Sequence, residues 1–396
     1  MRTIYLDHQA TTPMDPVVMD VMQAAYTQYF ANPASPHAVG VRAFREVERA
    51  RSAVARFVGG ARSEIYFTSG ATEANNIAIK GVAGRCPGGH IVTTATEHKS
   101  VLDTCEALHA AGCAVTVLPV DAQGRVTAEA VARHLRDDTV LVSVMLANNE
   151  IGTIQPIAEI GRVTRQAGVP LHCDATQAVG SLAVDVTELG VDLLTLSGHK
   201  IYGPKGIGAL YVANRLTDIA PLAPLIHGGG QERGLRAGTL NTAAIIGLGA
   251  AITLVEETRD QEARRLAKFR GTFLAELTAR SRAPFRLNSG TGPDFLPHAL
   301  NLSFEGVDAQ ELLPRLTDLA ISTGSACNSS AQEPSHVLRA IGLPPERIRG
   351  SIRLSFGRFT AERDAIDAAC SLAAAALPQP ESAAPGRAGQ KGAAAW

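Results

Sequence analysis

Two polar residues follow apolar stretches at positions that suit covalent and acid–base chemistry. Lys200 comes directly after the apolar run 193–197 and has His199 beside it, and Asp174 ends the apolar run that begins at Pro170. A lysine among apolar walls and cationic neighbours can have the lowered pKa that Schiff-base chemistry requires. A carboxylate at a strand end can hold a protonated pyridine nitrogen. The alternatives are a surface-loop lysine and an ordinary helix N-cap.

A cysteine in a polar segment is the candidate nucleophile. Cys327 lies within residues 322–333, a run of small and polar residues with no apolar period that would bury a thiol. Most unpaired cysteines are buried as small hydrophobic side chains. Such apolar contexts surround Cys105, Cys113, Cys173 and Cys370. An accessible thiol on a mobile loop is a better nucleophile, so we favour a functional Cys327 over a structural one.

A possible anion site begins where residues 65–69 lead into the segment 70–76. An apolar strand meets small and hydroxyl residues there, and a helix follows. Backbone amides and the helix dipole at such a junction suit a phosphate, although a plain N-cap by Ser69 or Thr72 explains the same pattern. The segment matches neither glycine fingerprint of nucleotide-binding folds, which argues against nucleoside triphosphates and dinucleotides.

Three further polar residues stand near predicted strands. His98 follows the second apolar strand and Asn149 follows the fourth. Arg353 lies inside the apolar run 351–356, where a buried charge needs a partner. That partner is either a substrate carboxylate, which an arginine binds bidentately, or an internal salt bridge. Lys205 competes with Lys200 as the reactive amine, but its Gly and Pro neighbours look like a turn.

Short β-branched runs that alternate with helical stretches predict an α/β domain with a mainly parallel sheet covered by helices. The last two runs lie too close for a helical crossover and suit antiparallel pairing. The expected strands are 65–69, 91–95, 114–120, 140–145, 170–174, 192–197 and 207–212. The expected helices are 38–57, 73–81, 100–111, 128–135 and 157–167.

After residue 234 the pattern changes to a smaller α+β domain. We expect two long helices over 241–282, strands at 299–304, 319–323 and 351–356, and helices at 309–316 and 334–341. The expected domains are a large one over 12–261 and a small one from 1–11 and 262–377. The small domain carries the mobile cysteine loop 322–333, and the Ala-, Gly- and Pro-rich tail 378–396 is expected to be disordered.

Composition excludes several classes of protein. The 396 residues include 37 basic and 38 acidic ones, so no basic excess points to direct nucleic-acid binding, and 45% hydrophobic content excludes a disordered chain. The six cysteines form no CxxC pair, which argues against a metal site and for reduced thiols. No signal-like N-terminus or membrane-length apolar run occurs, because 243–255 is too short. We therefore expect a cytoplasmic protein without membrane attachment.

Taken together, the motifs resemble those of cysteine desulfurases of iron–sulfur cluster assembly and nitrogen fixation. These belong to the class V aminotransferase branch of the pyridoxal-phosphate enzymes with the aspartate-aminotransferase fold. The resemblance covers roughly residues 3–376, and the ordered series is specific although each motif alone is weak. The series contains Tyr5-Leu6-Asp7, Ala10-Thr11-Thr12-Pro13, Asn32-Pro33-Ala34-Ser35, Thr68-Ser69-Gly70-Ala71-Thr72-Glu73, Asn148-Asn149-Glu150, Asp174-Ala175-Thr176-Gln177, Ser197-Gly198-His199-Lys200, Gly228-Gly229-Gly230-Gln231-Glu232-Arg233, Ser325-Ala326-Cys327 and Glu333-Pro334-Ser335-His336-Val337-Leu338.

The resemblance assigns roles to residues already singled out. Lys200 would hold pyridoxal 5'-phosphate covalently, Asp174 would bind its pyridinium nitrogen and Gln177 its ring hydroxyl. His98 would stack on the ring and transfer protons. The remaining assignments are phosphate binding by Ala71, Thr72, Ser197 and His199, contact with the partner subunit's phosphate by Thr239, and substrate-carboxylate binding by Asn149 and Arg353. The position of Thr239 implies a homodimer.

The implied reaction removes sulfur from L-cysteine, leaving L-alanine and a persulfide on Cys327. That sulfur would pass to an acceptor such as an iron–sulfur scaffold protein, and Cys327 could also serve as a transient iron–sulfur ligand. A selenocysteine lyase or a class V aminotransferase is the first alternative. An inactive assembly scaffold is a more remote one, since it predicts the loss of a cofactor residue or of Cys327.

Overall fold

The computed structural model describes residues 2–219, 222–323 and 334–377. Within these ranges the largest sheet has seven strands in the order β2-β8-β7-β6-β5-β3-β4. They are β2 (Ile65–Thr68), β3 (His90–Thr94), β4 (Ala114–Leu118), β5 (Thr139–Ser143), β6 (Leu171–Asp174), β7 (Leu193–Ser197) and β8 (Gly208–Val212). Only β8 runs against its neighbours, β2 and β7. The mainly parallel sheet and the antiparallel final pair are confirmed.

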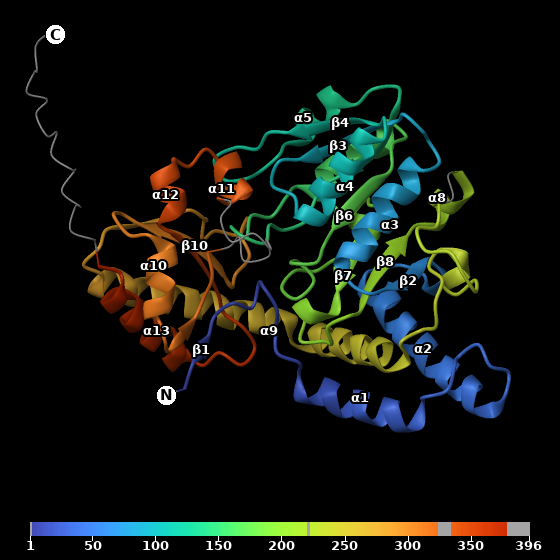
Figure 1. Cartoon of the computed structure of the whole chain (residues 1–396), viewed down its shortest axis with the longest axis horizontal. Helices are drawn as coiled ribbons and strands as arrows, with labels where there is room; N and C mark the ends of the chain where they lie inside the picture. Colours follow the sequence, from blue (N-terminus) through green and yellow to red (C-terminus); the bar gives the residue numbers. More distant parts are fainter. Residues whose placement is uncertain (1, 220–221, 324–333, 378–396) are drawn as a thin grey trace, which may run out of the picture.

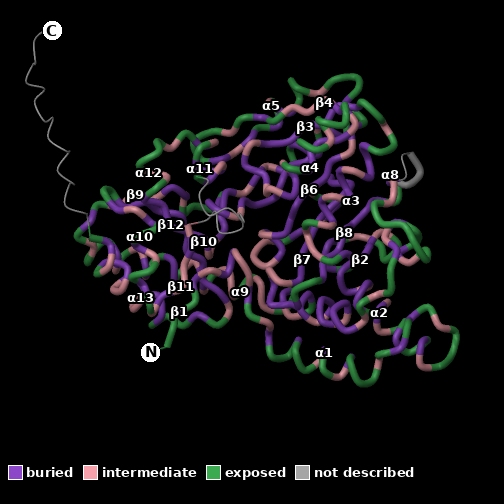
Figure 2. The backbone as a smooth tube through the Cα atoms, in the orientation of Figure 1, coloured by how far each residue is buried: buried purple, intermediate pink, exposed green. Residues whose placement is uncertain are grey.

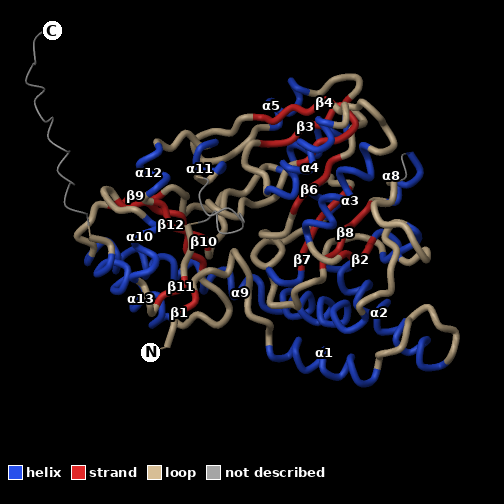
Figure 3. Tube along the Cα trace, viewed as in Figure 1, coloured by secondary structure: helices blue, strands red, loops and turns tan. Residues whose placement is uncertain are grey.

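Helices cover both faces of this sheet (Figures 1 and 3). Along β7, Leu193 packs into the apolar cluster that contains α3, whereas Leu194 packs into the cluster that contains α2 and α6. This alternation follows from the two-residue period of a strand, and it buries the sheet on both sides. The helices of this part are α1 (Pro16–Gln28), α2 (Ala38–Phe57), α3 (Ala71–Ala83), α4 (Lys99–Ala110), α5 (Ala128–His134), α6 (Ile157–Gln166), α7 (Val186–Leu189) and α8 (Asn214–Ile219).

Two smaller sheets and a second apolar cluster make up most of the C-terminal part. The parallel pair joins β1 (Ile4–Tyr5) to β11 (Leu319–Ala320), and the antiparallel sheet has the order β12-β10-β9. Its strands are β9 (Phe285–Leu287), β10 (Ala299–Phe304) and β12 (Ser351–Ser355), and the helices nearby are α10 (Ala309–Leu312), α11 (His336–Ala340), α12 (Pro345–Arg349) and α13 (Glu362–Ala375). The helix expected over 309–316 stops early, because Pro314 lacks the amide that would continue it.

A single helix, α9 (Thr242–Arg280), replaces the two helices expected over 241–282. No proline interrupts this stretch, and its three internal glycines cost helix stability without forcing a break. Residues up to Val255 pack into the cluster of the large sheet, whereas Leu266 and the buried residues after it pack into the second cluster. Figure 2 shows buried backbone along both parts of this helix. This change of packing partner supports our proposal of a domain boundary near residue 261.

No helix in the described ranges is both long enough and apolar enough to cross a membrane. Residues 324–333 of the expected cysteine loop 322–333 and the tail 378–396 lie outside the described residues.

Candidate active site

A cavity of about 430 Å³ lies at the edge where the parallel strands of the large sheet end. Because β2, β3, β5, β6 and β7 run in the same direction, their carboxyl ends meet at one edge, where ligand sites form in open α/β sheets. Ten predicted residues line the cavity: Ala71, Thr72, His98, Asn149, Asp174, Gln177, Ser197, His199, Lys200 and Arg353. Thr239 is exposed and does not line it, and Cys327 lies outside the described residues.

The N-terminal segment lies across Lys200. β7 ends at Ser197, and a 3-10 turn over Gly198–Lys200 brings the lysine to the cavity. The Lys200 Nζ donates to the backbone carbonyl of Gln9 and, at 2.9 Å, to that of Ala10. Lys200 is therefore a partly buried residue of the cavity rather than a surface lysine. Lys205 also lines the cavity but is exposed.

Gln9 is a cavity residue whose role sequence reasoning did not identify. Its side chain is 1% exposed, and neither of its amide atoms has a hydrogen-bond partner among the described residues. The Gln177 Nε2 donates to the backbone carbonyl of Gln9 at 3.0 Å, so Gln9 also holds the side chain of Gln177 in the cavity wall. A glutamine in an irregular N-terminal segment carries no periodic signal, and only the contact with Lys200 identifies it.

Asp174 is the last residue of β6 and is 6% exposed. Its Oδ1 accepts from the Thr176 amide at 3.0 Å, and its Oδ2 accepts from the Asn75 Nδ2 at 2.8 Å. The helix N-cap expected as the alternative role of Asp174 is wrong, because turns follow β6 and the next helix, α7, begins only at Val186. Asn75 belongs to α3 and lies within the segment 70–76 that the sequence offered as an anion site.

Two histidines of the cavity are held neutral by their surroundings. Burial lowers the pKa of His98, against the opposing effect of Asp174, and Lys200 lowers it further. Burial and the charges of Lys200 and Lys205 lower the pKa of His199 to about 4. The His199 Nδ1 lies 3.1 Å from the Thr11 Oγ1, and Thr12 donates to the His199 carbonyl at 2.9 Å. Neutral imidazoles suit hydrogen bonding and proton exchange near pH 7.

The start of α3 has no side-chain cap. Its N-cap is Gly70, so the expected capping by Ser69 or Thr72 is wrong. Gly70 has φ +149°. A Cβ atom on Gly208 would lie 2.8 Å from the Gly70 Cα, so the absence of a side chain at position 208 allows β8 to lie close to this turn. Ala71 and Thr72 of the first turn line the cavity beside Ser197, at the helix end whose amides suit an anion.

A carboxylate near this helix start is already neutralised. The Glu73 Oε1 accepts from the Arg236 Nε at 2.8 Å, and the Glu73 Oε2 accepts from the Ser69 amide at 2.9 Å. Burial raises the pKa of Glu73, but the hydrogen bonds from Arg236 and Ser69 outweigh burial and hold the pKa below its ordinary value. The pairing with Arg236 reduces the repulsion that Glu73 would exert on an anion bound at this site.

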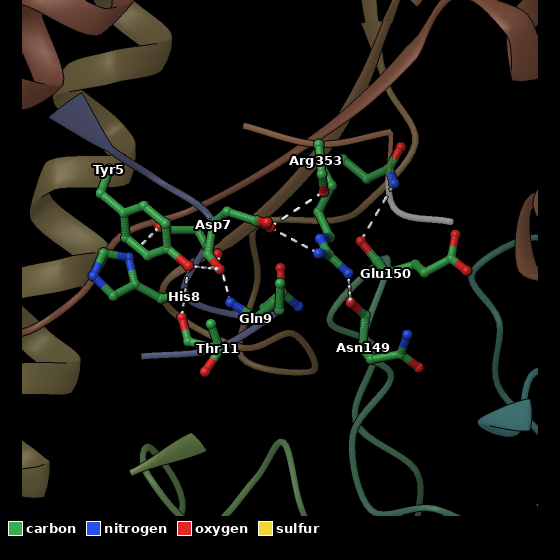
Figure 4. A network of polar contacts seen from close by, with 12 residues as sticks. Tyr5, Asp7, His8, Gln9, Thr11, Asn149, Glu150 and Arg353 are labelled. Carbon is green, nitrogen blue, oxygen red and sulfur yellow. Dashed lines mark hydrogen bonds and ion pairs between the residues drawn. The ribbon is translucent and has the colours of Figure 1, made fainter. Parts of the chain in front are cut away.

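Arg353 lies between Asp7 and the loop that carries Asn149 (Figure 4). It lies on β12, is 1% exposed and lines the cavity. Its Nη2 donates to the Asp7 Oδ1 at 2.7 Å, and its Nη1 donates to the Asn149 carbonyl at 3.0 Å. The Ser322 hydroxyl donates to the same Asp7 oxygen at 3.2 Å. Arg353 therefore forms an internal salt bridge and also reaches the cavity.

The loop after β5 places two further polar groups beside Arg353. Asn149 lines the cavity, and its Oδ1 is buried without a hydrogen-bond partner in the described part of the chain. Glu150 is 3% exposed and accepts from the Ser335 hydroxyl at 2.6 Å. Burial raises the pKa of Glu150 despite that hydrogen bond and the charges of His336 and Arg353. The Asn149 amide is the group of this loop that is available to a ligand.

The cavity joins an amine, a carboxylate, a neutral imidazole and a guanidinium. The uncapped helix start suits a phosphate, Asp174 suits a protonated ring nitrogen, and Arg353 suits a carboxylate. Within residues 2–219, 222–323 and 334–377, no group of three or more His, Cys, Asp and Glu side chains is arranged to hold a metal ion. The donor set therefore matches an organic phosphate and an amino acid.

The fold and this site define the class of protein to which the chain belongs. Residues 4–368 match the model of the aminotransferase class-V family. A solved structure of a NifS-like protein superposes with a TM-score of 0.87 at 34% identity, covering 94% of this chain and 98% of the other. The chain belongs to the class V aminotransferases.

Within that family the chain groups with the cysteine desulfurases. It is 46% identical over 372 residues to the cysteine desulfurase IscS of Rickettsia akari, covering 93% of this chain and 90% of that protein. A structure of SspA in complex with cysteine superposes with a TM-score of 0.79 at 40% identity, covering 89% of this chain and 99% of the other. The resemblance to this family seen in the motifs is confirmed.

Proposed function

We propose that this chain is a pyridoxal-phosphate-dependent cysteine desulfurase that converts L-cysteine to L-alanine and transfers the sulfur to Cys327. The observation that carries the proposal is the single cavity in which Lys200, Asp174 and Arg353 meet. An amine, an acid and a guanidinium in that arrangement suit a ring cofactor bound next to an amino-acid substrate.

The residues present fit pyridoxal phosphate. The uncapped start of α3, with Ser197 and His199, would hold the phosphate, and Asp174 would hold the pyridine nitrogen. Gln177 would contact the ring hydroxyl, and His98 would stack on the ring. Buried polar atoms in the cavity wall that lack a partner among the described residues support the fit: the Gln9 amide, the Asn149 Oδ1 and the Thr176 Oγ1. Such atoms cost free energy unless a ligand pairs with them.

When bound, the cofactor supplies an electron sink that weakens bonds at the substrate's α-carbon. Lys200 would hold the cofactor covalently and then accept the substrate's Cα proton at Nζ. The carbonyls of Gln9 and Ala10 fix the position of that amine. Burial keeps His98 neutral, which suits it for returning protons near the reacting atoms.

Arg353 and Asn149 would bind and orient the substrate carboxylate. Asp7 holds the Arg353 guanidinium in place from one side at 2.7 Å. A guanidinium whose rotamer is fixed in this way loses little conformational freedom when it binds the substrate. The Asn149 side-chain amide would form a hydrogen bond with the bound amino acid or with the cofactor ring. That hydrogen bond would offset the cost of burying the Asn149 Oδ1 without a partner.

The Cys327 thiolate would attack the sulfur of the activated substrate, forming an S–S bond as the substrate's Cβ–S bond breaks. The electron pair of that bond would stay with the carbon fragment, which becomes L-alanine on protonation, and Cys327 would deliver the persulfide sulfur to an acceptor protein. We further propose a cytoplasmic homodimer in which Thr239 serves the partner's phosphate site, and delivery of sulfur to a scaffold for iron–sulfur clusters. The exposure of Thr239 away from its own cavity supports the dimer. The family membership supports the sulfur chemistry.

Mass spectrometry of the chain after exposure to L-cysteine tests the function. We expect one added sulfur on the peptide that carries Cys327, and one L-alanine formed for each sulfur released when a thiol reductant is present. Cys327→Ser should abolish both. The matched control is Cys370→Ser, a partly exposed cysteine on α13 far along the chain from the loop, which should leave alanine formation unchanged.

Two results would contradict the proposal. Full-rate alanine formation by Cys327→Ser would exclude the persulfide step, and conversion of the amino acid to a keto acid would favour a plain aminotransferase. A protein that takes up no pyridoxal phosphate would revive the inactive scaffold.

A further inference from the structure

Asn75 connects three parts of the cavity wall. It lies on α3, is completely buried, and uses both hydrogens of its Nδ2, one to the Asp174 Oδ2 at 2.8 Å and one to the Ser100 Oγ at 2.9 Å. A carboxylate accepts hydrogen bonds and donates none, so the opposite orientation of the amide would place two acceptors against each other. The orientation of the Asn75 amide is therefore fixed by Asp174.

The direction of the next hydrogen bond follows from this orientation. Since the Ser100 hydroxyl accepts from Asn75, its own proton is available to the His98 Nδ1, which lies 2.8 Å away. The Ser100 backbone amide also donates to the same nitrogen at 3.1 Å. A proton on Nδ1 would face two donors, so Nδ1 acts as an acceptor and the proton of the neutral ring lies on Nε2.

We propose that Asn75 and Ser100 are positioning residues that hold His98 as its Nε2–H tautomer and join that tautomer to Asp174. This inference rests on the function proposed above, in which His98 exchanges protons beside the cofactor. Because Nδ1 holds the only free lone pair of the neutral ring and is engaged by Ser100, the ring donates a hydrogen bond through Nε2–H and can accept a proton only at Nδ1. Asn75 also holds the Asp174 carboxylate, which is assigned to the ring nitrogen. A single side chain therefore positions both His98 and Asp174.

The residues of this network come from two helices and one strand. His98 is the N-cap of α4, Ser100 lies in the first turn of α4, Asn75 lies on α3, and Asp174 ends β6. Burial, the largest effect, lowers the pKa of His98, which agrees with a ring that accepts at Nδ1. The remaining charges that act on His98 are those of Asp174, Lys200, His336 and Asp103.

Nitrogen NMR on the full-length protein, labelled with ¹⁵N in the histidine rings, measures the tautomer directly. Spectra are recorded with and without pyridoxal phosphate, and His98→Gln identifies the His98 signals among the 11 histidines. We expect a pyridine-type Nδ1 and a proton-bearing Nε2 at neutral pH in the wild-type protein. Ser100→Ala removes the hydroxyl but keeps the backbone amide that also donates to Nδ1, so it should raise the share of the Nδ1–H tautomer without making it complete. Ser100→Thr, which keeps the hydroxyl, should restore the wild-type spectrum.

Turnover of L-cysteine provides the second readout. We expect kcat to fall about tenfold in Ser100→Ala and about a hundredfold in Asn75→Ala, with KM nearly unchanged, since acid–base positioning acts on the chemical step. The matched controls are Asn76→Ala, the adjacent asparagine whose amide donates to the Thr72 carbonyl, and Thr104→Val, which removes a buried hydroxyl one turn further along α4. Both should keep kcat and the His98 spectrum.

A proton on Nδ1 in the wild-type protein would overturn the proposal, whether or not the variants fold. An unchanged His98 spectrum in Ser100→Ala would also overturn it. The tautomer is measured without substrate and does not depend on turnover. If the protein gave the expected spectrum but formed no alanine from L-cysteine, the proposed function would be rejected and the tautomer assignment would stand.

Discussion

The two ends of the cavity are built from different kinds of structure. At the sheet-edge end (Ala71, His98, Asp174 and Lys200), each residue ends or follows a strand of one buried sheet. At the guanidinium end (Asp7, Asn149 and Arg353), the residues come from the segment after β1, the loop after β5, and β12 of another sheet. The first end depends on one set of strands, whereas the second depends on how two apolar clusters meet.

This difference separates the expected effects of substitution. The sheet-edge end is fixed by backbone pairing within a buried sheet, so a change there should alter the chemistry without moving its neighbours. The guanidinium end is fixed by side chains that bridge two clusters, so a change there should alter substrate affinity and the fit between the clusters together. Effects on kcat and on KM should therefore divide between the two ends.

The largest expected effect is at the sheet-edge end. Asp174→Asn should lower kcat about a thousandfold, because an amide cannot stabilise a protonated ring nitrogen as a carboxylate does. Weaker retention of pyridoxal phosphate during dialysis should accompany the loss. Steady-state kinetics and cofactor absorbance measure the two effects.

A second buried aspartate, which directly precedes β7, is the matched control. Asp192 is 1% exposed and its Oδ2 accepts from the Leu171 amide at 3.0 Å, at the opposite end of β6. Asp192→Asn should lower the free energy of unfolding by about 1–3 kcal/mol while kcat stays the same. Equal kinetic losses in both variants would mean that Asp174 is a structural residue.

At the guanidinium end, Arg353→Lys should raise KM for L-cysteine about thirtyfold with a smaller change in kcat, because an ammonium cannot reproduce the planar fork. Asp7→Asn should give part of that rise, and the double variant should show less than the sum, since both act on one contact. Kinetics of the four proteins measure the coupling.

Arg270→Lys is the control for that series. Arg270 is also buried, and it donates to the carbonyls of Leu296 and Thr291 at 2.8 and 2.6 Å, away from the cavity. The Arg270→Lys protein should have a lower free energy of unfolding than the wild-type protein and the same KM for L-cysteine. Additive effects of the Asp7 and Arg353 substitutions would separate Asp7 from substrate binding.

The smallest expected effect concerns a carboxyl group beside the sheet-edge end. Glu97 is completely buried and accepts from the Met145 amide and the Thr94 hydroxyl. Burial, opposed by these hydrogen bonds, raises the pKa of Glu97 to about 8. Since the folded pKa exceeds the unfolded one, the folded protein retains a proton that the unfolded chain has lost, and stability falls as pH rises from about 4.5 to about 8.

Glu97→Gln, which mimics the protonated acid, should remove this contribution. Allowing for relaxation around the buried group, we expect the wild-type protein to lose about 1–2 kcal/mol relative to the variant between pH about 5 and pH about 9. Denaturant unfolding at both pH values measures the difference. Parallel pH dependences would place the Glu97 titration outside this range.

Strand-end residues were predictable from the sequence because an apolar run makes the following polar residue conspicuous. Asp174 and Lys200 were found in this way, and both line the cavity. Gln9 and Asn75 were not, since one lies in an irregular segment and the other on the buried side of a helix. The two helices expected over 241–282 were wrong, because periodicity does not reveal that one helix changes its packing partner without breaking.

The order of apolar runs and polar ends in the sequence determined the mainly parallel sheet and the residues that gather at its carboxyl edge. These features follow from neighbours in the chain, where hydrophobic period and turn residues act. Packing between distant parts of the chain, by contrast, pairs Asp7 with Arg353, joins Asp174 to Ser100 through Asn75, and places the Gln9 carbonyl against Lys200. Those contacts join residues up to hundreds of positions apart, and the packing of the clusters, which no local pattern encodes, brings them together.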